Sequence, residues 1–354
     1  MVRYEAKTAI ATPNIALIKY WGRRDSVLNL PFNSSLSMTL DFSLSTKTTV
    51  LFTDEVKRNT FYLNQRLMRS GLDNEKLENM RKVVNEMKEL AGVKESLNAV
   101  IVSENSFPTD AGIASSSSGG AALVFAVNAS LGLELTPREL SIFARKISGS
   151  ACRSVFGGIV KWNKGKRRDG LDSYSERIPD SNKWGDLMDI IAIVSYGKKT
   201  ISSSAGHDIT SSTSPLYRLR PKLAEESIEK ALNFIRKMDF GGLGELIMRD
   251  SNNMHAAMMD SWPPIMYLND TSKKVIRVIE RLNEREGRII AAYTFDAGPN
   301  PHIITLRSYA KMTEHALREV KGIKRILKSG LGYGPKIVQG SLLSGDEKLS
   351  FKPL

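Results

Sequence analysis

The chain is poor in several residue types that mark particular classes of protein. Its 354 residues include one cysteine, Cys152, so no internal disulfide can form. The four histidines are scattered and show no spacing typical of structural zinc sites. No apolar run approaches the roughly 20 residues that a membrane-spanning helix needs. The composition therefore predicts a soluble protein without disulfides and without a metal-binding cluster.

The amino terminus lacks the features of a secretory leader. The segment "MVRYEAKTAIATPNIALIKYW" has an acidic residue near its start and no continuous apolar stretch followed by a small-residue cleavage site. Internal repeats, low-complexity tails and long linkers are also missing. We therefore expect a cytoplasmic chain that is compact throughout, and its length predicts one large domain or two closely packed ones.

Positive charge predominates over negative charge. The chain has 51 Lys and Arg against 38 Asp and Glu, a formal net charge of +13. A basic chain can bind nucleic acid, an anionic surface or a polyanionic substrate, or can simply be soluble in an acidic cell interior. Its two basic segments, "KGKRRDG" (164–170) and "KGIKRILK" (321–328), lack the interleaved aromatic residues that stack on bases. Both are interpreted as solvated faces, and no nucleic-acid or membrane partner is predicted.

The pattern of apolar residues predicts an α+β chain in two halves that join near residues 185–200. Residues 7–53 form short β-rich runs between turn residues, and helices follow, one of them beginning with a capping box at Thr136 and Glu139. Further on, the predicted elements are strands in "GGIVKW" and "MDIIAIVSY", a run of helices from "PKLAEESIEKALNFIRKM", strands in "RIIAAYTFDAG" and "PHIITL", and a final helix in "YAKMTEHALREV".

A segment rich in Gly and Ser, "SFPTDAGIASSSSGGAAL" (106–123), opens a predicted helix from about Ser116 to Leu131. Glycines let backbone N–H groups close on an anion, and the helix N-terminus adds the positive end of its dipole. The segment is neither the nucleotide P-loop nor the dinucleotide fingerprint. By itself it predicts a phosphate site and a plain helix cap equally well. The candidate phosphate-loop residues are Asp110, Gly112, Ser115, Ser116, Ser117 and Gly119.

Three other segments place ionisable side chains among apolar or small residues. In "ATPNIALIKYWGRRD", Lys19 is expected either on a solvated strand face or buried beside Trp21. In "SGSACRSVFGG", Arg153 suits bidentate recognition of a carboxylate or phosphate, and equally an ordinary ion pair. In "TFDAGPN", Asp296 follows an apolar strand, a position typical of catalytic carboxylates and of turn caps alike. None of these segments decides the function alone.

Taken together, six ordered motifs between about Ala9 and Gly334 closely resemble the diphosphomevalonate decarboxylases, members of the GHMP kinase superfamily. The motifs are "NIALIKYWGRRD…LNLPFNSSLSMTLD", "FPTDAGIASSSSGGAAL", "SGSACRSVFGG", "KKTISSSAGHDITSSTS", "RDSNNMHAAMMDSWPPIMYLNDTS" and "YTFDAGPN". The resemblance implies a two-domain GHMP-kinase-like fold with the active site in the cleft between the halves. Residues 1–190 would form the domain with the phosphate loop and residues 191–354 an α+β domain, usually in a homodimer.

The family converts mevalonate 5-diphosphate into isopentenyl diphosphate, with ATP phosphorylating the 3-hydroxyl before phosphate and CO₂ leave. The resemblance assigns catalytic roles to Asp296, Lys19 and Arg153, and has Asn14 and Arg153 hold the C1 carboxylate. Such a carboxylate would stabilise the positive charge that develops at C3, and the two cations would neutralise the departing phosphate. Further residues expected at or near the phosphates of a phosphorylated mevalonate are Tyr20, Arg23, Ser148, Ser150, Ser202, Ser203 and Ser204.

Departures from the family pattern concern whether the chain binds a nucleotide. Asp110 stands where the family commonly has Ala, and a carboxylate beside a triphosphate is repelled by about 1 kcal/mol at 4 Å in water and by a few times that near a protein surface. Arg23 stands where the family commonly has Lys, and the loop is unusually rich in Ser. These features favour the archaeal branch that decarboxylates mevalonate 3,5-bisphosphate without any cofactor. The alternative is the ATP-dependent enzyme, with Asp110 turned outward or recruiting Mg²⁺.

Other functions leave parts of the sequence unexplained. A nucleic-acid-binding protein accounts for neither "SACRS" nor "TFDAGPN". The related mevalonate 3-kinases are disfavoured because the resemblance matches Asp296 to an aspartate that they lack. His255 is expected to pack on a helix and Cys152 to be a buried structural residue rather than a reactive thiol. The role of His207 is left open.

Overall fold

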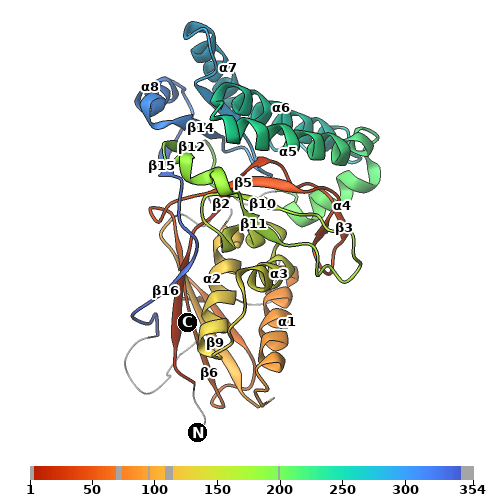
Figure 1. The fold of residues 1–354 in the computed structure, drawn as a ribbon, viewed down its shortest axis with the longest axis vertical. Helices are drawn as coiled ribbons and strands as arrows, with labels where there is room; N and C mark the ends of the chain where they lie inside the picture. Colours follow the sequence, from red (N-terminus) through yellow and green to blue (C-terminus); the bar gives the residue numbers. More distant parts are fainter. Residues whose placement is uncertain (1–3, 69–73, 95, 108–114, 198–199, 344–354) are drawn as a thin grey trace.

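The fold is described by a computed structural model that covers residues 4–68, 74–94, 96–107, 115–197 and 200–343 (Figure 1). Helices and strands are mixed along the chain, as predicted. Three larger sheets and a short two-stranded ribbon form the framework. In these residues no helix has both the length and the apolar character needed to cross a bilayer.

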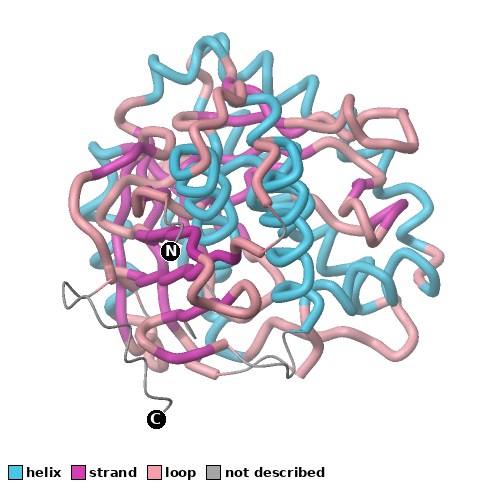
Figure 2. The backbone as a smooth tube through the Cα atoms, turned by 90° about the horizontal axis from the view of Figure 1, so that it is seen from below, coloured by secondary structure: helices cyan, strands magenta, loops and turns pink. Residues whose placement is uncertain are grey.

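The first sheet has six strands and carries three helices on it. Its order is β16 (Lys336–Val338), β1 (Lys7–Ala11), β6 (Thr46–Thr53), β9 (Asn98–Asn105), β7 (Thr60–Leu63) and β8 (Arg66–Leu67). The helices are α1 (Asn74–Leu90), α2 (Ser115–Ser130) and α3 (Pro137–Ile147). Helix α2 packs on β1 and β6 and is covered by α3, so most of its surface is buried, which fits its largely apolar sequence. In Figure 2, the view from below, most strands gather on one side with helices beside them.

A second sheet lies in the middle of the molecule and leads into the site. Its order is β11 (Ser175–Arg177), β10 (Ile159–Trp162), β5 (Ser35–Thr39) and β2 (Asn14–Ile18). The ribbon of β3 (Arg23–Asp25) and β4 (Leu30–Pro31) follows β2, and the 3₁₀ segment η2 (Gly149–Val155) follows α3. All five residues of β2 are buried, as expected for a strand covered on both faces.

The third sheet is four-stranded and antiparallel. Its order is β13 (Ala291–Thr294), β14 (His302–Leu306), β12 (Leu187–Ile193) and β15 (Arg325–Gly330). The helices around it are α5 (Arg220–Lys237), α6 (Phe240–Met259), α7 (Asp270–Arg285) and α8 (Arg307–Arg318), at the top of Figure 1. Helix α4 (Ser203–Thr213) and the 3₁₀ segments η3 (Pro179–Trp184) and η4 (Leu216–Leu219) complete this part.

The first part of the chain, up to β11, and the second part, from η3 onward, share one of the apolar clusters of the molecule. Ile15 and Leu36 from the middle sheet pack in the same buried cluster as Ile228 and Leu243 from α5 and α6. The chain also returns to its beginning, because β16 pairs with β1 through Thr8 and Val338. The predicted final helix, α8, is therefore not the last element, since two strands follow it. The proposed domain boundary at 190/191 falls inside β12 and stays a prediction.

Several local predictions are confirmed. Thr136 caps α3 through the amide of Glu139, whose carboxylate accepts in return from the Thr136 amide. Cys152 is buried, and burial raises the pKa of its thiol to about 11, so a structural role is supported over a reactive one.

Candidate active site

A cavity of about 300 Å³ lies between the two parts of the chain. Its wall combines the ends of β2 and β3, the first turns of α1 and α2, and η2 from the first part with α4, α6 and the segment after β13 from the second. The predicted residues on the wall are Lys19, Tyr20, Arg23, Ser115, Ser116, Ser148, Ser150, Arg153, Ser203, Ser204 and Asp296. The cavity thus gathers most of the predicted site residues from distant parts of the sequence.

Lys19 and Asp296 form an ion pair in this cavity. Lys19 Nζ donates to Asp296 Oδ1 at 2.7 Å. The lysine side chain is only 1% exposed, whereas the aspartate side chain is 35% exposed, so the carboxylate faces the cavity and the ammonium lies behind it. The solvated position considered for Lys19 is wrong, because β2 is buried on both faces and the second part of the chain covers its end.

The pair sets the ionisation of both groups. Burial alone would raise the pKa of Asp296, but the charge of Lys19, supported by His302 and Arg153, lowers it to about 2. Burial lowers the pKa of Lys19, and Asp296 counteracts that shift. Asp296 is therefore an ionised carboxylate throughout the neutral pH range, with its cation fixed at one oxygen.

Both backbone groups of Lys19 are held by a buried ion pair from the second part of the chain. Asp250 Oδ2 accepts the Lys19 amide at 2.7 Å, and Arg220 Nη2 donates to the Lys19 carbonyl at 3.2 Å. Asp250 and Arg220 bind each other through two hydrogen bonds and are each 1% exposed. Asn33 also donates to the Lys19 carbonyl. This arrangement fixes the point from which the lysine side chain leaves the strand.

Arg153 lies on the cavity wall with two of its three nitrogens held by the protein. Its Nε donates to Asn14 Oδ1 at 3.1 Å and its Nη1 to Ser35 Oγ at 2.7 Å. Among the residues that the structure describes, Nη2 has no protein acceptor. Asn14 in turn donates to the carbonyl of Ser150 and to Ser154 Oγ. Asn14 therefore lies behind Arg153 and orients it, and an Nη2 group is available for an oxyanion on the cavity side.

An aromatic stack separates Lys19 from Arg23. The His207 ring lies between Tyr20 and Trp21, with ring centroids 4.4 and 4.2 Å apart. His207 Nδ1 accepts the Gly22 amide at 2.7 Å, so the proton of the neutral ring is on Nε2. Gly149 leaves room for Tyr20, since a Cβ there would come within 2.7 Å of the tyrosine ring. Close packing of α4 and η2 against residues 20–22 shapes this wall.

The N-terminus of α2 reaches the cavity, as the phosphate-loop hypothesis requires. Ser115 and Ser116 line the cavity, whereas Ser117 is buried within the helix packing. Gly119 has open space where a Cβ would stand, and the close approach belongs to Gly120, whose Cβ would lie 2.8 Å from that of Ala151. Asp110 and Gly112 lie outside the described residues. A helix N-terminus that carries two hydroxyls on a cavity wall is a suitable anion site.

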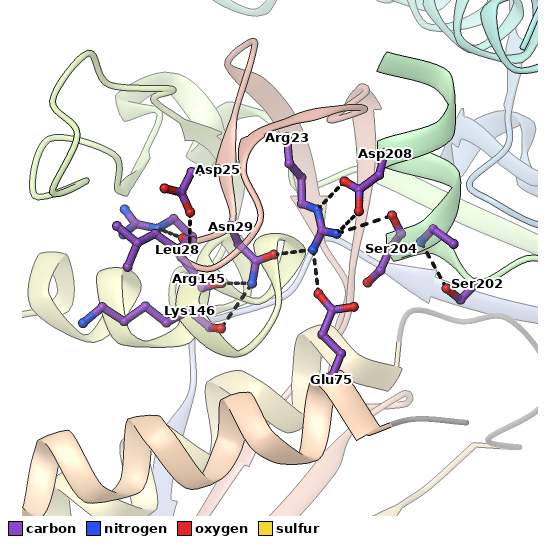
Figure 3. Close-up of polar contacts among 11 residues, drawn as sticks. Arg23, Asp25, Leu28, Asn29, Glu75, Arg145, Lys146, Ser202, Ser204 and Asp208 are labelled. Carbon is purple, nitrogen blue, oxygen red and sulfur yellow. Dashed lines mark hydrogen bonds and ion pairs between the residues drawn. The ribbon is translucent and has the colours of Figure 1, made fainter. Parts of the chain in front are cut away.

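Arg23 lies on another part of the wall and is surrounded by acceptors (Figure 3). Its guanidinium pairs with Asp208 of α4 through Nε and Nη2, at 3.1 and 2.6 Å, and with Glu75 of α1 through Nη1 at 2.7 Å. Nη1 also donates to Asn29 Oδ1 at 3.1 Å. Burial alone would lower the pKa of Arg23, but these two carboxylates raise it above its usual value. Neither Asp208 nor Glu75 was predicted as a site residue from the sequence.

Both halves of the chain match models of known protein families. A model described as a diphosphomevalonate decarboxylase-like N-terminal domain matches residues 11–175, and a mevalonate 5-diphosphate decarboxylase C-terminal domain matches residues 189–329. The chain belongs to the diphosphomevalonate decarboxylase family. It is accordingly a decarboxylase, a carboxy-lyase, with the α+β GHMP-kinase-like fold in two domains.

Individual members of the decarboxylase family resemble the chain over most of its length. The diphosphomevalonate decarboxylase of Debaryomyces hansenii is 43% identical over 302 residues, covering 83% of this chain and 77% of that protein. The solved mevalonate diphosphate decarboxylase of Staphylococcus aureus is 33% identical with a TM-score of 0.87, covering 96% of this chain and 99% of that one. MDDEF, at 33% identity and a TM-score of 0.86 over 96% and 100% of the chains, was solved in complex with MVAPP, AMPPCP and magnesium.

These relatives change the balance between the two predicted reactions. The Debaryomyces hansenii and Staphylococcus aureus proteins carry the diphosphate in their names, and MDDEF was solved with MVAPP, AMPPCP and magnesium. This favours the ATP-dependent alternative over the bisphosphate interpretation drawn from Asp110 and Arg23. The archaeal assignment has no support from the relatives compared, which include proteins of the fungi Debaryomyces hansenii and Saccharomyces cerevisiae and of the mammal Rattus norvegicus. Two of the predicted substrate-binding residues, Asn14 and Ser202, are not on the cavity wall, because Asn14 lies behind Arg153 and Ser202 caps α4 through the amide of Ala205.

Proposed function

We propose that this protein is an ATP-dependent diphosphomevalonate decarboxylase that converts mevalonate 5-diphosphate and ATP into isopentenyl diphosphate, ADP, phosphate and CO₂. One observation carries the proposal: an ionised carboxylate, Asp296, faces a cavity that also presents Arg153 and the N-terminus of α2. The family membership and the relative solved with MVAPP, AMPPCP and magnesium support this substrate and this nucleotide.

In this proposal, Arg153 holds the C1 carboxylate of the substrate. Arg153 lines the cavity, Asn14 and Ser35 fix its guanidinium plane, and no described residue accepts a hydrogen bond from its Nη2. A carboxylate held in one orientation aligns the bond to CO₂ with the bond to the departing phosphate on the neighbouring carbon, as elimination requires. Ser148 and Ser150, which lie on the same wall, add hydroxyl donors near that position.

Asp296 would act as a fixed negative charge and hydrogen-bond acceptor. A carboxyl group with a pKa near 2 is a weak base at neutral pH, because general bases work best when their pKa lies near the working pH. It can still accept a hydrogen bond from the 3-hydroxyl and stabilise the positive charge that develops at C3 when phosphate leaves. Lys19 holds the carboxylate in place and adds a cation beside the departing phosphate.

The residues present fit a nucleotide. Ser115, Ser116 and the first amides of α2 would hold its phosphates, since they face the cavity and a helix N-terminus favours anions. Bound ATP with Mg²⁺ supplies the phosphoryl group that makes the 3-oxygen a leaving group. No three His, Cys, Asp or Glu side chains gather as metal ligands within the described residues. That is compatible with Mg²⁺, which is commonly held by substrate phosphates, waters and one or two carboxylates.

We also propose that the protein is cytoplasmic and forms a homodimer. Exposed apolar side chains near η4 and the end of α6 support an interface there, because contiguous apolar patches on soluble proteins mark binding surfaces: Leu216, Leu219, Leu223, Met259, Trp262 and Met266. Sedimentation of the purified protein at micromolar concentration should give the mass of two chains. Trp262→Glu should shift it toward the mass of one, and a monomeric wild type would refute the proposal.

The deciding experiment measures CO₂ release by the purified protein. Mevalonate 5-diphosphate with ATP and Mg²⁺ is run beside mevalonate 3,5-bisphosphate without ATP. We expect turnover of the diphosphate that stops when ATP is left out. Turnover of the bisphosphate alone would replace the proposed function with the ATP-independent reaction. Release of ADP without CO₂ would mean that the protein is a kinase.

A further inference from the structure

The guanidinium of Arg23 is saturated by the protein's own acceptors. The structure gives it five hydrogen bonds, as many as a guanidinium has N–H groups. Asp208 takes two of them and Glu75 one, while Asn29 Oδ1 and the Ser204 carbonyl take the others (Figure 3). Arg23 in this state has no donor left for a phosphate, although the resemblance places it at the substrate's phosphates.

The partners of Arg23 differ from it in exposure. The Arg23 side chain is 4% exposed, whereas Glu75 is 46% and Asp208 51% exposed. A half-exposed carboxylate regains water when it leaves an ion pair, so its release costs less than the release of a buried one. The buried guanidinium has no such compensation and needs an anion at all times. The carboxylates are therefore the exchangeable members of the cluster, and Arg23 is the fixed one.

The exchange would take place on the wall of the active-site cavity. Arg23 and Glu75 line it together with Ser203, Ser204 and His207. Two carboxylates and one guanidinium leave one negative charge uncompensated within the cluster. An anion that approaches Arg23 must displace a carboxylate, and it is repelled by any carboxylate that remains.

We infer that Asp208 and Glu75 are counter-ions that the substrate's phosphate group displaces from Arg23, and that they set the affinity and anion selectivity of this part of the site. The inference rests on the proposed function, which brings a phosphorylated substrate to this wall. Weakly binding anions do not recover the cost of displacing two carboxylates, so Arg23 remains unavailable to them. A diphosphate, with several charged oxygens, can replace both carboxylates in the same plane.

Removing an acidic residue from the Arg23 cluster should tighten anion binding, whereas removing a residue from a binding site usually weakens it. Inorganic diphosphate is titrated into the protein by calorimetry at low ionic strength. Asp208→Asn should lower its Kd by about tenfold and Glu75→Gln by a smaller factor, since Asp208 holds two donors and Glu75 one. Both gains should shrink as salt is added, because exposed charges are screened.

Two controls isolate Arg23. Glu78→Gln removes the same charge from the same helix, one turn from Glu75, where the carboxylate pairs with Arg81 at the surface; its Kd should stay within twofold of wild type. Arg23→Gln should weaken binding, and adding Asp208→Asn to it should give no gain. Thermal melting of each variant checks that it is folded, and Glu75→Gln tests the inference should Asp208→Asn fail to fold.

The outcomes separate this inference from the proposed function. The inference is overturned if the Kd is unchanged or higher in both Asp208→Asn and Glu75→Gln, or if no variant binds diphosphate. The carboxylates would then only connect α1 and α4 to β3 in the folded structure. CO₂ release is measured independently. If the wild type releases no CO₂ but the variants bind diphosphate more tightly, the proposed function is refuted and the counter-ion exchange is still supported.

Discussion

Two cation clusters on the wall of one cavity are built in different ways. The Lys19 cluster comprises Lys19, Asp296, Asp250 and Arg220, and the Arg23 cluster comprises Arg23, Asp208, Glu75 and Asn29. In the first, Lys19, Arg220 and Asp250 are each 1% exposed and Asp296 is 35% exposed. In the second, the cation and Asn29 are buried, and both carboxylates are about half exposed.

This difference in exposure suits the two clusters to different steps, the chemical reaction and the binding of the substrate. A buried pair is expensive to break and so holds a reacting group in one place, as a fixed charge must be held to stabilise a transition state. A pair with exposed carboxylates can open when a stronger anion arrives. The Lys19 cluster is therefore expected to control the rate of the chemical step, and the Arg23 cluster the binding of phosphate groups.

The largest expected effect comes from removing the charge of Asp296. Asp296→Asn keeps the size and one oxygen of the side chain but leaves no negative charge near C3. We expect kcat for CO₂ release to fall about ten-thousandfold, with substrate binding by calorimetry nearly unchanged. Turnover within tenfold of wild type would mean that Asp296 does not carry the assigned role. Asp270→Asn, an exposed carboxylate on α7, is the matched control.

The buried anchor of Lys19 should dominate stability. Asp250→Asn leaves Arg220 buried without its counter-ion, and breaking such a pair costs about 3–5 kcal/mol of unfolding free energy. Glu245→Gln on the same helix breaks an exposed pair with Arg249 and should cost about 0.5 kcal/mol or less. Urea denaturation of the two variants measures the contrast. Equal losses would mean that the Lys19 cluster is no more rigid than the surface.

Arg153 tests the contact with the substrate's C1 carboxylate. Arg153→Lys keeps the charge but loses the planar donors that Asn14 and Ser35 hold and the Nη2 group that no described residue engages. We expect kcat/KM to fall about a hundredfold, with a raised KM for the substrate and an unchanged KM for ATP. A variant with wild-type kcat and KM would place the C1 carboxylate elsewhere.

Much of this arrangement was predictable, and the limits have physical causes. The fold followed from the family resemblance carried by six ordered motifs. The structure places Lys19, Arg153 and Asp296 on one cavity wall, as that resemblance implies, and their roles stay predictions. Asp208 and Glu75 gave no signal of their own, since an acidic residue on a polar helix is ordinarily solvated. Their pairing with Arg23 depends on α1 and α4 meeting at β3, which no local pattern records. The strands after α8 were missed because β16 is short and half exposed, and pairing with β1 alone defines it.

The smallest expected effect concerns His207, whose ring lies between Tyr20 and Trp21 and so joins the segment that carries Lys19 to the one that carries Arg23. Its Nδ1 accepts the buried Gly22 amide, and a buried amide without an acceptor costs about 1–3 kcal/mol. His207→Asn keeps an oxygen at the Nδ1 position, whereas His207→Gln moves the same amide group one methylene further out. We expect the Gln variant to be about 1 kcal/mol less stable than the Asn variant in urea denaturation. Because Gly22 precedes Arg23, the Gln variant should also bind inorganic diphosphate more weakly while the environment of Asp296 stays unchanged. Equal stability of the two variants would mean that the stacking of the His207 ring, and not its hydrogen bond to Gly22, keeps the Lys19 and Arg23 clusters in their relative positions.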